Sequence, residues 1–407
     1  MSSAITEVEE SKTGSSAPWP MVPIGDVFDI QQGKALSAAA RGASDRYPFL
    51  RTTNVLWNRI DGSSIDTMGL SAQERSRLAL CPGDLLVCEG GEIGRAAVWH
   101  GEIDECFYQN HIHRLRSRRE ASPEFFAFWF KYAFTMADLY QGAGTKTTIA
   151  NLSMGRLAAL PIPLPPLDEQ LRIAAALTTI QRAQNAVNSE IRQLEVLKES
   201  YKAGFLSAYS KTSQVALGSL RCSINTGPFG SQLHASDYVP VGVRVLNPMH
   251  LLRNGVVDGP TPCVNEHTAT RLERHKLRVG DVIIPRRGEL SRYARVDANI
   301  AGSLCGTGCM VIRLEDQRIN ADYFATYFGS EGAQAYLRDA ATGTIMPNIN
   351  PKILESMPIP LPSRAKQDEF VKGCDAIDSA LRAADNKTKV LSRVFDSALS
   401  CLFGPQL

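Results

Sequence analysis

The sequence has 407 residues, of which 44% are hydrophobic and 21% are charged, with a net charge of +2. This length and composition indicate about two to three globular domains and exclude disorder over most of the chain. No apolar run approaches the roughly 18 residues that a membrane span needs, and the start lacks the basic and apolar segments of a signal peptide. Nine cysteines without regular spacing are typical of reduced thiols, so we expect a cytoplasmic protein.

An internal repeat organises the chain. The run Leu80–Leu86 resembles Leu277–Ile283, and the run Leu160–Pro165 is nearly identical to Met357–Pro362. Both pairs are separated by 197 residues. One offset kept over so long a distance indicates a tandem duplication, in which each copy has a globular part followed by a proline-rich turn and a long helix.

The globular parts have the pattern of mixed α+β domains. Short β-branched and aromatic runs between Gly, Asp and Asn turns predict strands at Leu85–Cys88 and at residues 282–284. Helical spacing of phenylalanines predicts a helix over Pro123–Leu139, with a counterpart through Tyr323–Phe328.

The segment after each proline-rich turn has a heptad pattern. Alternating four- and three-residue spacings predict two long helices that pair as an antiparallel coiled coil with pseudo-two-fold symmetry. Ordinary core helices within each half are the alternative. The predicted seam of the first helix is Ile173, Leu177, Ile180, Gln184, Val187, Ile191, Leu194, Lys198, Tyr201 and Phe205. Each seam position recurs 197 residues later, as Phe370, Cys374, Ile377, Leu381, Ala384, Thr388, Leu391, Phe395, Ala398 and Leu402.

The sequence lacks the motifs of the common catalytic sites. It has no phosphate-binding loop, no H-E-x-x-H, no serine elbow and no Asn/Asp-Pro-Pro-aromatic motif of amino-group methyltransferases. The run Cys305–Cys309, with Cys263 and His267, lacks the spacing of a zinc site, so we expect buried thiols there. His111 and His113 lack a third ligand nearby and predict a polar surface face. We therefore expect no catalytic residue, no metal and no cofactor on this chain.

Several motifs carry a resemblance to a known family. They are Leu160–Gln170 and Met357–Gln367, the preceding segments Gly144–Leu152 and Gly343–Ile349, which both run from Gly-Thr to Asn-[Leu/Ile] with different internal spacing, and the opening run Trp19–Val27. In this order, and repeated, they resemble the specificity subunit of a Type I restriction-modification system over nearly the whole chain.

The resemblance implies a protein that reads DNA and catalyses nothing. Each target recognition domain would read one half of a split double-stranded DNA sequence, and the paired helices would fix the spacer between the halves. Two modification subunits would dock on the scaffold and use S-adenosylmethionine, and two motor-nuclease subunits, which use ATP and magnesium, would join in some systems. The expected segments are a flexible leader (1–18), the first recognition domain (19–160), a central helix (161–214), the second recognition domain (215–360) and a C-terminal helix (361–407).

The net charge of the two predicted recognition domains does not by itself indicate DNA binding. Residues 19–160 hold 15 Lys and Arg against 15 Asp and Glu, and residues 215–360 hold 15 against 13. We therefore expect partner subunits to supply much of the phosphate contact. Local basic clusters are a run at Arg114–Arg119 and a second group formed by Arg271, Arg274, Lys276, Arg278, Arg286 and Arg287, for which a solvated surface is the alternative.

Loop residues with donors and acceptors for base edges are the candidate DNA contacts. In the first half they are Lys34, Arg41, Thr52, Thr53, Asn54, Arg95, Gln109, Asn110, Lys146 and Thr147. In the second half they are Gln232, His234, Arg244, Asn247, His250, Arg286, Arg287, Arg292 and Thr344. The two sets differ in chemistry, which predicts two unlike half-sites.

Three other functions remain open at this point. The same scaffold would serve a Type II or another defence methyltransferase system. A stand-alone DNA methyltransferase or nuclease is disfavoured by the missing motifs, and a purely structural coiled-coil adaptor would have no sequence preference.

Overall fold

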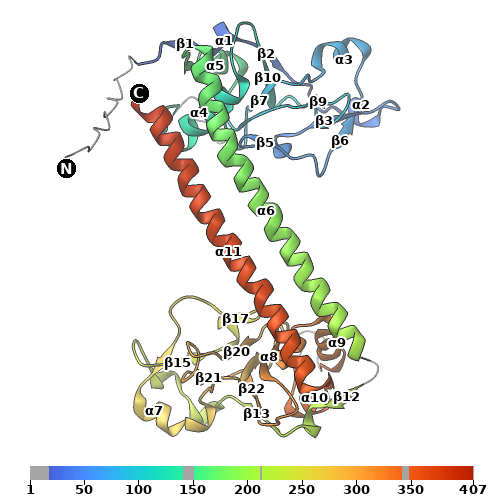
Figure 1. The fold of residues 1–407 in the computed structure, drawn as a ribbon, viewed down its shortest axis with the longest axis vertical. Helices are drawn as coiled ribbons and strands as arrows, with labels where there is room; N and C mark the ends of the chain where they lie inside the picture. Colours follow the sequence, from blue (N-terminus) through green and yellow to red (C-terminus); the bar gives the residue numbers. More distant parts are fainter. Residues whose placement is uncertain (1–17, 141–150, 211–212, 342–347, 407) are drawn as a thin grey trace, which may run out of the picture. The chain divides into compact units, whose positions relative to one another are not determined.

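The chain folds into two compact units that share two long helices. The computed structural model describes residues 18–140, 151–210, 213–341 and 348–406 (Figure 1). Unit 1 consists of Met1–Asn188 together with Asn386–Leu407, and unit 2 consists of Ser189–Asp385. Each long helix therefore contributes one part to each unit.

Unit 1 has mixed helices and strands, as the sequence predicts. A four-stranded antiparallel sheet has the order β2-β10-β7-β8, a three-stranded sheet has the order β6-β3-β9, and two strand pairs are β1-β11 and β4-β5. The strands are β1 (Met21–Pro23), β2 (Phe28–Gln32), β3 (Tyr47–Leu50), β4 (Val55–Leu56), β5 (Arg59–Ile60), β6 (Asp66–Met68), β7 (Leu85–Cys88), β8 (Ala96–Val98), β9 (Phe107–Tyr108), β10 (Ile112–Ser117) and β11 (Pro161–Pro163). The helices are α1 (Ile24–Val27), α2 (Ala38–Gly42), α3 (Ala72–Leu78), α4 (Pro123–Thr135), α5 (Met154–Ala158) and α6 (Leu167–Tyr209).

Unit 2 repeats the four-stranded sheet as β13-β22-β19-β20, with a second sheet β14-β18-β15-β21 and the pairs β12-β23 and β16-β17. Its strands are β12 (Gln214–Ala216), β13 (Cys222–Thr226), β14 (Tyr238–Val239), β15 (Val243–Leu246), β16 (Leu251–Leu252), β17 (Gly255–Val256), β18 (Cys263–Val264), β19 (Val282–Pro285), β20 (Ala294–Arg295), β21 (Leu304–Cys305), β22 (Cys309–Leu314) and β23 (Pro358–Pro360). Its helices are α7 (Glu266–Arg271), α8 (Ala321–Phe328), α9 (Glu331–Ala340), α10 (Pro351–Glu355) and α11 (Arg364–Phe403).

The duplicated Gly-Asp turn has the same hydrogen bonds in both units. The buried Asp84 carboxylate accepts two bonds of 2.7 Å from the guanidinium of Arg116. Asp281 accepts bonds of 2.8 and 2.7 Å from Arg313 in the same way. The preceding Gly83 has a φ of 93°, a conformation that glycine adopts without strain. In each unit, a buried ion pair therefore joins the repeated Gly-Asp turn to an arginine on another strand of the same sheet.

Two glutamines attach the first turn of each long helix to its globular part. The Gln170 side chain is buried and accepts a bond of 3.0 Å from the backbone N–H of Ser122. Gln367, also buried, accepts from the N–H of Asn320 at 2.8 Å and donates to two backbone carbonyl groups. Because an unsatisfied buried backbone group is costly, these amides fix where each helix begins.

The predicted heptad seam is the least exposed face of both helices, since each of its twenty residues is buried or partly buried. In unit 1, Ile173 and Leu177 share a core with Phe395 and Phe403. Phe403 also lies edge-on to Trp129, with ring centroids 5.4 Å apart.

In unit 2, the seam combines stacked rings with an ion pair. The ring of Phe370 stacks on Phe205 at 4.3 Å and on Tyr201 at 5.5 Å. Lys198 forms an ion pair with Asp378. Within this unit, residues late in α6 therefore contact residues early in α11.

Two local expectations need correction. Helix α4 ends at Thr135 rather than at Leu139, because the chain then turns through Asp138, which has a φ of 49°. His113 was expected on a polar surface, yet it is fully buried because β10 lies between β2 and β7 in the sheet. His111 precedes that strand and is exposed.

The basic run Arg114–Arg119 is mainly structural, because its side chains bond to neighbouring acidic and carbonyl groups. Arg114 is 6% exposed and donates to the carbonyl oxygen of Arg77. Arg118 pairs with Asp29 at 3.1 Å. The side chains of this run are therefore mostly engaged in contacts within unit 1.

Neither membrane helices nor metal clusters occur in the part of the chain that the structure describes. None of the described helices is long and apolar enough to cross a bilayer. The described residues also contain no group of three or more potential metal-ligating side chains. Cys263, Cys305 and Cys309 are buried free thiols, and burial raises the pKa of Cys309 to about 12.

Replacement of Gln367 by leucine tests the anchoring of the second helix. We expect Gln367→Leu to lower the free energy of unfolding of unit 2 by about 2–4 kcal/mol, because it leaves buried backbone groups unpaired. The measurement is the urea midpoint, with Lys366→Gln on the exposed neighbouring position as control. A loss below about 0.5 kcal/mol would contradict the assigned role.

Candidate functional site

Five of the predicted base-reading residues line one open cavity of about 550 Å³ in unit 1. They are Arg41, Thr52, Thr53, Gln109 and Asn110. The remaining lining residues are Ala35, Leu36, Arg51 and His111. The cavity thus combines guanidinium, amide and hydroxyl groups, which are the groups that recognise base edges.

Parallel pairing of β3 with β9 brings these loops together. Leu50 is opposite Tyr108, so the segments that follow both strands leave the sheet at the same edge. Gly33 allows the close approach of a third segment, since a Cβ there would lie 2.3 Å from the carbonyl oxygen of Gln109. Three loops that are far apart in the sequence therefore form this site together, so the sequence alone does not show that they are neighbours.

Other candidates in unit 1 hold the loops in place. The Asn54 side chain is buried, accepts from the N–H of Arg51 at 2.8 Å and donates to two carbonyl oxygens. Arg95 donates to the carbonyl oxygen of Thr52 at 2.5 Å. Lys34 pairs with Glu74 at 2.6 Å. These three side chains therefore stabilise the loops around the cavity through bonds within unit 1, and are less available for contact with a ligand.

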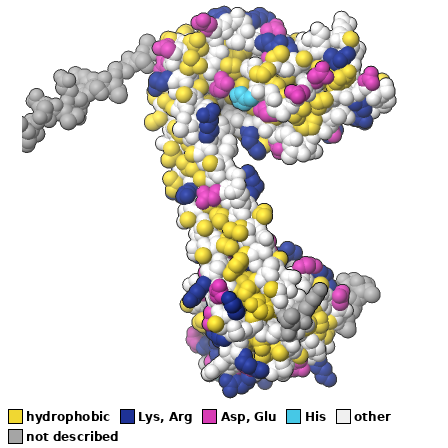
Figure 2. Space-filling model, turned by 45° about the vertical axis from the view of Figure 1, so that its right-hand side comes forward, with side chains coloured by type: hydrophobic (Ala, Val, Ile, Leu, Met, Phe, Trp, Pro, Cys, Tyr) yellow, Lys and Arg dark blue, Asp and Glu magenta, His cyan; other side chains and the backbone are white. Residues whose placement is uncertain are grey.

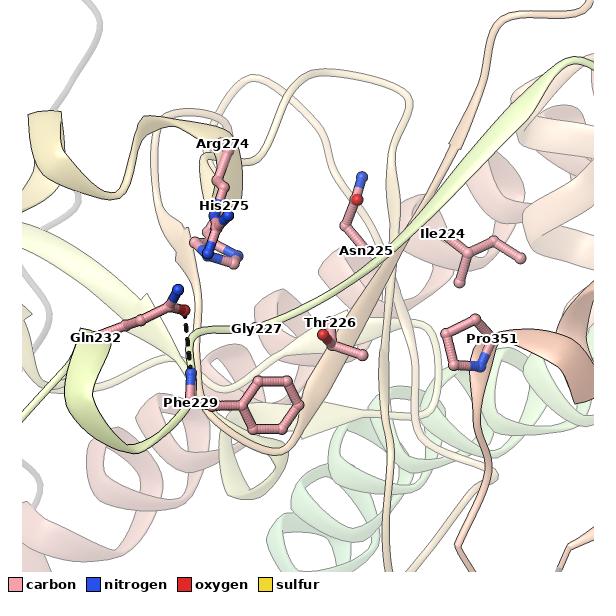
Figure 3. A pocket seen from close by; sticks show the side chains of 9 residues that line it. All are labelled: Ile224, Asn225, Thr226, Gly227, Phe229, Gln232, Arg274, His275 and Pro351. Atoms are coloured by element: carbon pink, nitrogen blue, oxygen red, sulfur yellow. Dashed lines mark hydrogen bonds between the residues drawn. The ribbon is translucent and has the colours of Figure 1, made fainter.

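In unit 2 a cavity of about 460 Å³ lies against the end of β13 (Figure 3). Of the predicted base-reading residues that the structure describes, Gln232 lines it. Figure 3 shows Gln232 close to Phe229, whose N–H donates to the amide oxygen of Gln232 at 3.3 Å. The other lining residues are Ile224, Asn225, Thr226, Gly227, Arg274, His275 and Pro351.

The remaining candidates of unit 2 differ in their surroundings. His250 is buried, and its Nδ1 accepts from the N–H of Asn247 at 3.0 Å, as Asn54 does for its own turn. Burial lowers the pKa of His250, which favours the neutral acceptor form.

The arginine candidates of unit 2 also differ. Arg244 donates to the carbonyl oxygen of Asn299, and Arg292 pairs with Glu289 at 2.7 Å. Arg287 is exposed. His234 is exposed as well. Arg286 has no carboxylate partner among the described residues, and its guanidinium lies over the ring of Phe229 at 5.2 Å.

Sequence reasoning missed several lining residues, including Asn225, Phe229 and His275. Arg274 was noted only as part of a basic cluster. A signal existed, because Gly33 and Gly227 both follow the strand that borders each sheet and both need close backbone approach. Lys146, Thr147 and Thr344 lie outside the described residues.

A family model for the Type I restriction modification DNA specificity domain matches residues 17–196 and 271–392. These segments fall in both repeats and together cover well over half of the chain. The chain belongs to this family.

Named relatives of this specificity family match along most of the chain. The putative type I restriction enzyme MjaX specificity subunit of Methanocaldococcus jannaschii is 20% identical over 387 residues, which cover 89% of this chain and 87% of the relative. The type I restriction enzyme EcoKI specificity subunit of Escherichia coli is 22% identical over 429 residues, covering 94% and 89%. The crystal structure of the Type I restriction-modification S subunit from M. genitalium has a TM-score of 0.57 at 15% identity, covering 96% and 97%. This last likeness concerns the fold.

Acid should destabilise unit 1 through His113. Its Nε2 bonds the carbonyl oxygen of Leu152 at 3.0 Å, and burial lowers its pKa. The folded state then binds fewer protons than the unfolded state. The contribution of neutral His113 to the free energy of unfolding is therefore fully present above the unfolded pKa of about 6.5, and it decreases as the pH drops below that value.

The measurement compares urea midpoints between about pH 7.5 and 5.5. We expect His113→Gln to reduce the loss on acidification, by at most about 1.4 kcal/mol per pH unit. The exposed His100→Gln serves as control and should follow the wild type. An unchanged slope in His113→Gln would argue against a neutral buried imidazole.

Proposed function

We propose that this chain is the DNA sequence-specificity subunit of a Type I restriction-modification complex and catalyses no reaction itself. The observation that carries the proposal is the family match in both repeats. Residues 19–160 and 215–360 each read one half of a bipartite target. S-adenosylmethionine, ATP and magnesium bind to partner subunits.

The two cavities support reading of two unlike half-sites. The lining in unit 1 includes Arg41, Gln109 and Asn110, whereas that in unit 2 includes Arg274, His275 and Phe229. Different donor and acceptor sets select different base edges. We therefore expect a recognition sequence that is not a palindrome.

The helices at 161–214 and 361–407 act as an antiparallel, pseudo-two-fold spacer in this proposal. Support comes from the shared 197-residue offset of the seam and from its low exposure in both units. A stiff helix pair would convert helix length into distance between half-sites.

The outer face of the helices has apolar residues suited to docking of two modification subunits. Leu197 is 52% exposed and Val394, 197 residues later, is 46% exposed. Val196 and Val390 are also exposed. Figure 2 shows hydrophobic side chains on the surface of the long helices. Repeated apolar positions would give two copies of one partner equivalent surfaces.

Insertion of one heptad into both helices tests the spacer. The insertion sites are after Asn188 and after Asp385, where the compact units meet in the sequence. Seven residues add about 10 Å, or about three base pairs, so the spacer should lengthen while both half-sites stay unchanged.

The readout is sequencing of methylated bases in cells that express the chain with its methyltransferase. Unmodified chain must first give methylation at one bipartite sequence, which tests the proposed function. A heptad in one helix alone is the control and should abolish methylation. Retention of the original spacing in the double insertion would reject the spacer role.

Charge on the repeated apolar positions tests docking. We expect the pair Leu197→Glu and Val394→Glu to abolish association with the modification subunit while changing the free energy of unfolding by less than about 0.5 kcal/mol. The measurement is copurification and sedimentation of the complex. The pair Ala203→Glu and Ser400→Glu, also exposed and 197 residues apart, is the matched control. Intact complexes from the first pair would place the partner elsewhere.

A further inference from the structure

Two arginines at the cavity of unit 2 have no carboxylate partner among the described residues. Arg274 lines the cavity, and Arg286 lies beside it on the ring of Phe229. Many other arginines of the described chain, such as Arg116 and Arg313, pair with acidic groups. The two unneutralised guanidinium groups are therefore available to a ligand with acceptor atoms.

Arg274 is held in place by a neutral group. Its Nε donates to Nε2 of His275 at 3.0 Å, and Figure 3 shows both side chains together at the cavity. His275 is buried, and burial together with the charge of Arg274 lowers its pKa. A neutral imidazole orients the guanidinium without cancelling its charge. The two terminal nitrogens of Arg274 stay available for a planar pair of acceptors.

Arg286 is held in place by an aromatic ring. Its guanidinium lies 5.2 Å from the centroid of Phe229, which is 50% exposed. Its Nε is buried and has no hydrogen-bond partner among the residues that the structure describes. Attraction between the guanidinium and the aromatic face limits the positions of the side chain and so reduces the ordering needed for a bidentate contact.

The other side chains that line the cavity favour contact with the edge of a base over contact with a phosphate group. Asn225, Thr226 and Gln232 contribute amide and hydroxyl groups, and no lysine lines the described cavity. An oriented guanidinium matches the O6 and N7 acceptors of guanine, which is the commonest specific arginine contact in DNA. We propose that Arg274 and Arg286 each read a guanine in the second half-site. This inference rests on the proposed function.

Unit 1 has an arginine at the position of Arg274 but a glutamate at the position of Arg286. Glu89 lies 197 residues before Arg286, and both accept a matching backbone bond, from Leu152 at 2.8 Å and from Ile349 at 3.0 Å. The Glu89 carboxylate accepts from Gln32 at 3.1 Å. The positions of Arg274 and His275 are Arg77 and Leu78 in unit 1, so an arginine is present there without the imidazole that orients it. The first half-site therefore lacks the contact proposed for Arg286 and the orienting bond proposed for Arg274.

The experiment maps methylation by the assembled complex containing Arg274→Ala or Arg286→Ala. Each variant should lose its preference for guanine at one base pair of the second half-site by about tenfold or more. The first half-site and the spacer should stay unchanged. Arg338→Ala on the exposed surface of the same unit is the control. The lysine variants Arg274→Lys and Arg286→Lys keep the charge and should relax the same base pair.

Binding measurements distinguish guanine from phosphate. Titration of the complex with target and mismatched duplexes at several salt concentrations should show weaker discrimination with an unchanged salt slope. Equal weakening on all duplexes, with a salt slope smaller by about one, would assign the arginine to a phosphate and overturn the proposal. Unchanged discrimination in both variants would also overturn it. Absence of sequence-specific methylation by the unmodified complex would instead reject the proposed function.

Discussion

The direction in which each long helix leaves its globular part depends on one buried side-chain amide. Gln170 and Gln367 satisfy backbone groups of the segment that precedes a neighbouring helix, and each also bonds to the proline-rich turn before its own helix. Rotation of the helix start would leave these groups unpaired in a dry environment. Each globular part is therefore hydrogen-bonded to the first turn of its own long helix.

Periodic features of the fold could be predicted from the sequence, because repetition makes them visible. The seam from Ile173 to Phe205 and its copy from Phe370 to Leu402 followed from spacing alone. The strand at Leu85–Cys88 followed from its apolar run. Such features depend on local sequence and on one face of an element.

The cavities could be predicted only in part, because they depend on long-range strand order. Five of the candidate loop residues line one cavity because β3 pairs with β9, although no sequence pattern indicated that pairing. His113 and Arg114 looked like surface residues, yet β10 is a central strand and buries both. Arg274 was a member of a basic run, and only its bond to His275 distinguishes it from the arginines that form ion pairs.

The composition of unit 1 has a consequence for synthesis of the chain. Trp19, Phe125 and Trp129 pack against Phe403, which belongs to the last helix. While the ribosome is still translating the second repeat, these rings have no partner at that place. Nascent unit 1 therefore keeps an open aromatic surface until the segment that contains Phe403 has been synthesised, and chaperone binding during that interval would protect it from aggregation.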